Sequence, residues 1–353
     1  MMAARTDDLS NWHVIGHDWA VRALARSIAT DRIAHAYLFT GPHATGKTTL
    51  ARALAQALEC TSINRPCGEC ATCQRIAQNR HPDVQLVEGV PPRFDFDKDA
   101  IPLARTNDWE HRTLRIKQIR DIEHFVSRSP FEGHWKIVIL RRFEEAEDPA
   151  ANAFLKTLEE PPSHTRLILT ARDTSLLLPT IASRCQVFAL RPLALAEVES
   201  ALIQRWQVEP EQARLLAHLS GGRLGWAVRA SADHALLDVR RRHLDMLNIV
   251  LGEGRAERLG RAGDLAKETD TLPELLEQWI GWWRDVLIVQ NGDRERVSNV
   301  DCEKDLYDHA ARFGLEDIQD VLKSLRATTR YLAQNVNARL AMEVLLLNLP
   351  GIT

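Results

Sequence analysis

The stretch Gly41-Pro42-His43-Ala44-Thr45-Gly46-Lys47-Thr48 decides the fold of this chain, because it fits the pattern G-x-x-x-x-G-K-[ST] in a suitable setting. An apolar segment, residues 36–40, precedes it, and a helical pattern, residues 49–54, follows it. Glycines at both ends let backbone N–H groups converge on one concavity at a helix N-terminus, where a phosphate group is favoured. The stretch therefore predicts a phosphate-binding loop between a strand and a helix.

The residues of this loop have separate expected roles. We predict that Gly41, Gly46, Lys47, Thr48 and Thr49 bind the phosphates of a nucleotide. Lys47 would reach the β- and γ-phosphates of ATP, and Thr48 would hold Mg²⁺. Whether the bound nucleotide is hydrolysed depends on residues elsewhere in the chain.

Composition limits the class of protein. The 353 residues are too many for one compact core and predict two or three domains, with 45% apolar and 26% charged residues. A formal net charge of −3 provides no overall basic field, so any contact with DNA would be local or made through partner chains. The polar start at residues 1–10 has no signal-peptide core, and no long apolar run predicts a membrane span. We expect a cytoplasmic protein.

Four of the six cysteines form a cluster with the spacing C-x₆-C-x₂-C-x₂-C, made by Cys60, Cys67, Cys70 and Cys73. Paired C-x₂-C turns place thiolates at the spacing of a tetrahedral zinc site, and four sulfur ligands leave no open position for catalysis. The pattern predicts a structural zinc ion. Four reduced, buried cysteines are the alternative.

Strands and helices alternate in the first part of the chain. Apolar runs of the kind buried in a parallel sheet occur at residues 36–40, 83–88, 135–140, 166–171 and 186–190. Helical patterns separate them, which predicts a doubly wound α/β domain, whereas residues 89–112 show no period and predict a loop. Beyond Pro192 the pattern is only helical.

Three tryptophans, Trp279, Trp282 and Trp283, lie in one of these later helical segments. They could form a platform on which bases stack. Since their neighbours are apolar and the segment is helical, we expect them in a core or an interface.

Several stretches together resemble the delta prime subunit family of the bacterial DNA polymerase III clamp loader, within the AAA+ ATPases. The stretches are the phosphate loop, the cysteine cluster, Ile116-Lys117-Gln118-Ile119-Arg120, N-A-F-L-K-T-L-E-E-P-P at 152–162, Ser183-Arg184-Cys185, Ser220-Gly221-Gly222-Arg223 and N-V-N-A-R-L from Asn335 to Leu340. The resemblance covers nearly the whole chain.

This resemblance implies three domains. They are an AAA+ core at 1–191 with an inserted zinc knuckle at 60–73, a helical lid at 192–231 and an all-helical collar at 232–353. It also implies a five-membered ring with the delta subunit and tau or gamma subunits. Such a ring opens the sliding clamp and loads it onto primed DNA.

Two departures from active members of the family concern hydrolysis. The positions expected to hold an acidic pair, after the strand at 135–140, are Arg141 and Arg142, and a guanidinium neither binds Mg²⁺ nor accepts a proton. Glu144 and Glu145 could replace the pair, but we expect the turn there to point them elsewhere. The arginine that active members aim at the γ-phosphate from the lid falls at Gly225. Arg223 is near, but we expect it to face another side.

The resemblance assigns an arginine finger to Arg184, which would reach ATP held by the neighbouring subunit. Such an arginine stabilises the charge that builds on the γ-phosphate. A surface arginine that caps a helix end is the alternative for Arg184. The chain is therefore expected to be a stator of the ring that binds ATP weakly or not at all and does not hydrolyse it. An active motor subunit of tau or gamma type is the alternative function, and a zinc-dependent nucleic-acid binder acting alone is a third.

Overall fold

The computed structural model describes residues 10–91, 94–96, 99, 112–293, 296–333 and 336–351. Most of the loop predicted at 89–112, and Asn335 of the last motif, lie outside these residues. The chain divides into two compact units. Of the described residues, the first contains those up to Leu193 together with Arg223–Gly225, and the second contains Ala194–Gly222 and those from Trp226 onward.

The first unit is built on a five-stranded sheet with the order β2-β3-β4-β1-β5. The strands are β1 (Ala36–Thr40), β2 (Val84–Val87), β3 (Lys136–Leu140), β4 (Thr165–Ala171) and β5 (Gln186–Ala189). Every neighbouring pair is parallel. This confirms the parallel α/β sheet that the apolar runs predict.

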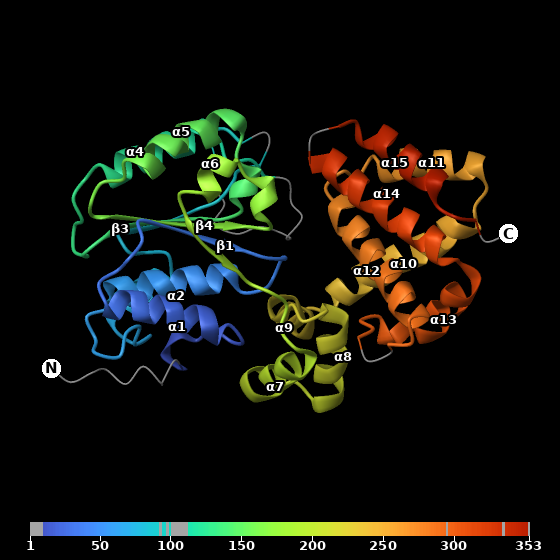
Figure 1. Cartoon of the computed structure of the whole chain (residues 1–353), viewed down its shortest axis with the longest axis horizontal. Helices are drawn as coiled ribbons and strands as arrows, with labels where there is room; N and C mark the ends of the chain where they lie inside the picture. The colour runs from blue at the N-terminus through green and yellow to red at the C-terminus, as the bar shows by residue number, and fades with distance from the viewer. Residues whose placement is uncertain are drawn as a thin grey trace. The chain divides into compact units, whose positions relative to one another are not determined.

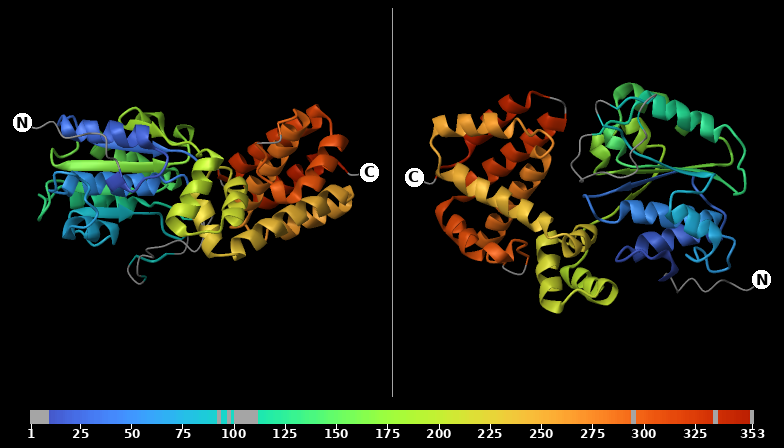
Figure 2. Two further views of the ribbon diagram at one scale, coloured as in Figure 1. Left: turned by 90° about the horizontal axis from the view of Figure 1, so that it is seen from below. Right: turned by 180° about the vertical axis from the view of Figure 1, so that it is seen from behind.

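Helices cover both faces of this sheet. Figure 1 shows α1 (Asp18–Ala29) and α2 (Lys47–Glu59) on one face, with α4 (Ile116–Val126) and α5 (Asp148–Glu159) on the other, and Figure 2 shows the same layers from two further sides. Side chains of β1 alternate between the layers, because Tyr37 and Phe39 pack with α1 and α2 while Leu38 packs with α4 and α5. Both faces are therefore buried.

Short elements fill the connections of the first unit. They are η1 (Ser10–Trp12), α3 (Ala71–Ala77), η2 (Phe143–Glu145), η3 (Thr174–Leu176) and α6 (Pro179–Ala182).

Two carboxylates hold the turn before β3. Asp83 is fully buried, bonds to Lys136 at 2.7 Å and accepts hydrogen bonds from the backbone N–H groups of residues 131–133. Glu59 accepts the next two, from residues 134 and 135, each at 2.8 Å. These hydrogen bonds hold the pKa of Asp83 well below its usual range although burial raises it.

The second unit is helical among its described residues. Its elements are α7 (Leu195–Trp206), α8 (Pro210–Ser220), α9 (Leu224–Ala232, whose first residues belong to the first unit), α10 (Ala235–Gly252), α11 (Arg255–Leu265), α12 (Leu272–Gln290), η4 (Val300–Cys302), α13 (Glu303–Arg312), α14 (Leu315–Ala333) and α15 (Ala338–Asn348). The division of this part into a lid and a collar stays a prediction.

The tryptophans of α12 lie in the core of the second unit. Trp279, Trp282 and Trp283 are at most 1% exposed, and they pack in one cluster with side chains of α10, α13, α14 and α15. The indole N–H of Trp282 donates to His309 at 3.0 Å. The expectation of a core rather than a base-stacking platform is confirmed.

Two buried arginines join separate elements of the second unit. Arg258 is 4% exposed, and its guanidinium donates to five backbone carbonyls, those of Val250, Leu251, Leu346, Leu349 and Pro350. These carbonyls lie at the C-terminal ends of α10 and α15, where the helix itself supplies no donor. Arg240, also 4% exposed, donates to Asp301 at 2.7 and 2.9 Å and to Asn299.

Candidate functional site

The predicted phosphate loop runs from the end of β1 to the start of α2, at the carboxyl edge of the sheet. Gly41 has a φ of 139°, and a Cβ there would lie 2.2 Å from the carbonyl oxygen of Leu190, so no larger residue fits. Gly46 precedes α2 with a φ of 92°. The backbone therefore has the curled form that converging N–H groups require.

Contacts within the loop place its lysine. Lys47 is 9% exposed, and its ammonium donates to the carbonyls of Gly41 at 2.6 Å and Pro42 at 2.5 Å. The His17 ring lies 2.9 Å from the carbonyl oxygen of Thr45. Thr48 and Thr49 follow in the first turn of α2. The predicted binding residues thus lie in one loop and one helix turn.

Arginines stand where an acidic pair would hold Mg²⁺. Arg141 and Arg142 directly follow β3, and Arg141 pairs with Glu88 at 2.7 Å. The backbone N–H of Arg142 donates to the Thr170 hydroxyl at 3.0 Å, which joins the ends of β3 and β4. Both positions are therefore cationic at the edge of the sheet that carries the phosphate loop.

The two glutamates of the next turn each face an arginine. Glu144 lies 3.3 Å from Arg172, with its side chain only 4% exposed, and Glu145 lies 3.5 Å from Arg142. Both belong to the short helix η2 rather than to the strand end. Because each carboxylate is paired with a guanidinium, neither offers an unbalanced negative charge to a metal ion.

Arg172 is a site residue that the sequence reasoning missed. It directly follows β4, the strand beside β1, and its carbonyl oxygen accepts the N–H of Gly41 at 3.1 Å. The sequence could have indicated Arg172, because a residue at the carboxyl end of a neighbouring parallel strand lies beside the phosphate loop.

The start of α9 also reaches the loop. The N–H of Gly225 donates to the carbonyl of Ala44 at 2.9 Å, and a Cβ on Gly225 would lie 2.9 Å from that oxygen. Arg223, which precedes α9, lies near enough to the loop for its positive charge to lower the pKa of His43. The expectation that it faces another side than residue 225 stays a prediction.

The pKa of His43 is lowered by burial and by the positive charges around the phosphate loop. The residue is 8% exposed, and its pKa lies well below its ordinary value, first because of burial and then because of the positive charges of Arg142, Arg172, Lys47 and Arg223. The imidazole is therefore neutral at neutral pH. Cationic side chains from three separate segments surround this loop.

Arg184 lies between α6 and β5, with its side chain 35% exposed. Its guanidinium donates to the Thr180 carbonyl at 2.9 Å and pairs with Glu159 of α5 at 2.7 Å. An exposed ion pair of this kind contributes only about 0–1 kcal/mol, so Arg184 can exchange partners readily. Burial raises the pKa of the adjacent Cys185 to about 12, which keeps that thiol protonated.

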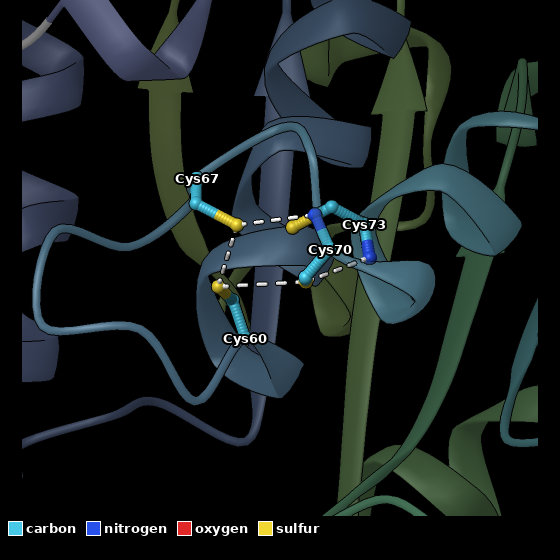
Figure 3. A group of neighbouring side chains, drawn as sticks. All are labelled: Cys60, Cys67, Cys70 and Cys73. Atoms are coloured by element: carbon cyan, nitrogen blue, oxygen red, sulfur yellow. Dashed lines mark hydrogen bonds between the residues drawn. The ribbon is translucent and has the colours of Figure 1, made fainter.

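The four clustered cysteines come together between α2 and α3 (Figure 3). Their sulfur atoms lie within 4.8 Å of one another, with Cys60 3.6 Å from Cys67 and 4.0 Å from Cys70. Zn–S bonds of about 2.3 Å in a tetrahedron separate sulfurs by about 3.8 Å. Cys60 thus joins the cluster across the six-residue first gap, and the group fits a metal ion such as zinc.

One thiol of the cluster, that of Cys67, has a lowered pKa and therefore ionises readily. Hydrogen bonds from the backbone N–H groups of Cys70 and Glu69 lower the pKa of Cys67 to about 6. Metals bind the thiolate form, so N–H donors that stabilise this anion suit a metal ligand.

A parallel sheet with a phosphate loop at its carboxyl edge and helices on both faces defines a P-loop α/β protein. A family model described as DNA polymerase III, delta subunit, matches residues 16–194, and one for the C-terminal part of the same subunit matches residues 236–350. The chain belongs to this DNA polymerase III subunit family.

The individual proteins to which the chain is similar are also DNA polymerase III subunits. The chain is 33% identical over 335 residues to DNA polymerase III subunit delta' of Pseudomonas aeruginosa, covering 90% of this chain and 93% of that one. It is 28% identical over 338 residues to the delta' subunit of Bacillus subtilis, covering 93% and 94%. Subunit tau of Escherichia coli is 33% identical over 218 residues, which cover 60% of this chain and 31% of tau. Within the described part of the chain, no helix has the length and apolar character to cross a membrane.

Proposed function

We propose that this chain is a delta prime subunit of a clamp loader. It would act as a stator in a five-membered ring with delta and tau or gamma subunits, in the cytoplasm, where the ring opens the sliding clamp and loads it onto primed DNA. Membership of the family and similarity to delta' subunits over nearly the whole chain support this role.

The absence of ATP hydrolysis by this subunit is the second part of the proposal. The observation that carries it is the pair Arg141 and Arg142 after β3, where hydrolysis requires carboxylates for Mg²⁺ and for activating water. The neighbouring Glu144 and Glu145 are paired with arginines and do not restore such a site. The phosphate loop would then bind ATP weakly and leave it intact.

Catalysis in the ring would use Arg184 in trans. Its position before β5, its partial exposure and its weak pairing with Glu159 suit an arginine that leaves its own subunit to contact a neighbour's γ-phosphate. Guanidinium groups delivered in this way accelerate phosphoryl transfer by about 10³-fold or more in other enzymes.

The alternative of an active motor subunit rests on the intact phosphate loop and the similarity to tau. It requires ATP turnover by the isolated chain. We expect turnover no higher than the background, and turnover that disappears in Lys47→Ala would favour the motor.

The role of Arg184 is tested in a reconstituted ring. Arg184→Ala should leave assembly unchanged, by size-exclusion chromatography, and lower the ATPase rate stimulated by clamp and DNA by about 10-fold or more. Arg205→Ala, at the end of α7, serves as a control for loss of a surface arginine. An unchanged rate in the Arg184→Ala ring would contradict the trans role.

The cysteine cluster would hold a structural Zn²⁺ with Cys60, Cys67, Cys70 and Cys73 as ligands. When bound, the ion supplies no chemistry to ATP and only fixes the loop between α2 and α3. Elemental analysis should find one zinc per chain, with the metal lost in Cys67→Ser. A structural zinc contributes about 10–16 kcal/mol of apparent binding free energy, so chelation should unfold this loop. Less than one zinc per undamaged chain would refute the site.

A further inference from the structure

Cationic residues gather at the carboxyl edge of the sheet, around the phosphate loop. Arg142 follows β3 and Arg172 follows β4, and these two strands are neighbours, with β1 next to β4. Two hydrogen bonds fix this proximity, because the carbonyl of Arg172 accepts the N–H of Gly41 at 3.1 Å and the N–H of Arg142 donates to the Thr170 hydroxyl at 3.0 Å. With Lys47 inside the loop, three cationic residues come from three adjacent strand ends.

The carboxylates of this edge do not reverse the sign of the charge. Glu88 is matched by Arg141 at 2.7 Å, Glu144 by Arg172 and Glu145 by Arg142. Lys47 and Arg223 add two further positive charges near His43. The loop is therefore surrounded by net positive charge at the positions where a hydrolysing site holds a divalent cation.

A divalent cation and the arginines Arg142 and Arg172 would compete for the same phosphate oxygens. Mg²⁺ bridges phosphate oxygens and needs carboxylate or hydroxyl ligands in return, and like charges close by oppose it. A guanidinium instead binds phosphate oxygens directly, with two parallel hydrogen bonds. The metal-free phosphate chain also has two more negative charges than its Mg²⁺ complex, so it is the better partner for a cationic pocket.

We propose that the phosphate loop binds a chain of two or three phosphates, as in ADP or ATP, in its metal-free form, with Arg142 and Arg172 replacing Mg²⁺. The proposal rests on the assigned phosphate loop of the proposed function, but it does not depend on Arg184. It makes Mg²⁺ an inhibitor of binding rather than a requirement. Nucleotide held in this way keeps no metal for hydrolysis, consistent with a subunit that does not turn ATP over.

The test measures ATP binding to the full-length chain by isothermal titration calorimetry, in excess EDTA and in excess Mg²⁺. We expect binding in EDTA, with a dissociation constant about 10-fold lower than in Mg²⁺, which is the effect of roughly one charge-assisted hydrogen bond. Equal or tighter binding in Mg²⁺, or no binding in EDTA, would overturn the proposal.

Variants identify the groups responsible. Arg172→Met and Arg142→Met should each weaken binding in EDTA by about 10-fold, while Arg22→Met, an exposed arginine of α1, should leave it unchanged. Circular dichroism shows whether each variant is folded, and Arg172→Met decides if Arg142→Met does not fold. Unchanged affinity in folded Arg172→Met would contradict the role of the arginines.

Inorganic tripolyphosphate separates the phosphate chain from the nucleoside. It should displace ATP from the chain in EDTA, because the proposal assigns the affinity to the phosphates. Failure of tripolyphosphate to compete would overturn this assignment. These results are separate from those of the proposed function, since the Arg184 test measures ATP hydrolysed by neighbouring subunits.

Discussion

Both units of the chain contain arginines that are buried or partly buried, but the partners of these arginines differ. In the second unit, Arg258 donates to five backbone carbonyls, and Arg240 bonds a carboxylate and an amide at short distances. In the first unit, Arg142 and Arg172 face carboxylates at 3.5 and 3.3 Å beside a loop that suits phosphate. Arginine thus donates hydrogen bonds to the carbonyls of helix ends in one unit, and in the other it adds positive charge beside a candidate site.

The two kinds of arginine also differ in how strongly the groups around them depend on the guanidinium. The carbonyls around Arg258 are buried with it, so they lose a donor that water cannot easily replace. The carboxylates Glu144 and Glu145 lie at the edge of a site, where removal of the arginine relieves crowding of positive charge. Stability should therefore depend strongly on the first kind of arginine and weakly on the second.

The largest expected effect is that of Arg258→Met. It removes the guanidinium from five backbone carbonyls at the ends of α10 and α15, of which that of Val250 keeps the N–H of Glu253, so the free energy of unfolding of the second unit should fall by about 3 kcal/mol or more. Urea denaturation followed by tryptophan fluorescence measures it, because Trp279, Trp282 and Trp283 lie in that core. Arg261→Met, on the same helix and paired with Glu253 in an ion pair, should cost less than about 1 kcal/mol. Equal effects of the two changes would contradict the structural role of Arg258.

Arg240→Met should have an intermediate effect. Its loss removes hydrogen bonds to Asp301 and Asn299, but the Asp301 side chain is 29% exposed and can be hydrated. We expect the free energy of unfolding to fall by about 2 kcal/mol in the same denaturation experiment. Arg241→Met, the next residue of α10 and exposed, is the matched control. A loss as small as that of the control would show that the buried pair adds nothing.

Acid should destabilise both units through neutral buried histidines. Burial and then Arg242 lower the pKa of His243 to about 4, and burial and then nearby arginines lower that of His43. The unfolded chain binds these protons below about pH 6.5, whereas the folded chain does not, so stability is full above that pH. It should fall as the pH drops toward 4, by at most about 1.4 kcal/mol per pH unit for each histidine.

Denaturation at several pH values measures this loss, and His243→Leu should make the slope for the second unit shallower. Stability that rises between pH 6.5 and 4 would be the opposite of the expected result. A slope unchanged in His243→Leu would exclude that residue as a source.

The smallest effect on stability is expected for Arg172→Met. Its guanidinium is one-third exposed and lies among other positive charges, but the Glu144 side chain 3.3 Å away is only 4% exposed. These two effects oppose each other, so the free energy of unfolding should fall by about 1 kcal/mol. In the same variant, the pKa of His43 should rise, measured by NMR titration of its ring protons, because one nearby positive charge is gone. A large loss of stability would show that the fold depends on Arg172 as it does on Arg258, and it would contradict the proposed difference between the two units.

Much of the fold follows from local sequence. Continuous apolar runs such as residues 136–140 identify strands buried on both faces, and the spacing of glycines and Lys47 identifies the loop between strand and helix. The tryptophans of α12 are recognisable as core from their apolar neighbours. The cysteines are recognisable as a cluster, since their spacing alone brings the sulfurs together.

Other features depend on contacts between distant residues. Nothing around Arg258 distinguishes it among 45 lysines and arginines, because its acceptors lie up to 92 positions away. The place of Arg223 near the loop depends on where α9 begins, and helix boundaries are the least certain part of a prediction from sequence. Arg172 belongs to the site only because β4 lies between β3 and β1, and strand order is not written in any single segment.

The contacts of Arg258 also set an order of events during synthesis. Its acceptors at Leu346, Leu349 and Pro350 leave the ribosome long after Arg258 itself, whereas the last strand of the first unit ends at Ala189. Domains generally fold in the order in which they emerge. The sheet can therefore be complete while α10 and α11 still lack the helix that closes them, and a nascent chain halted before residue 346 would expose the apolar surface that α15 covers.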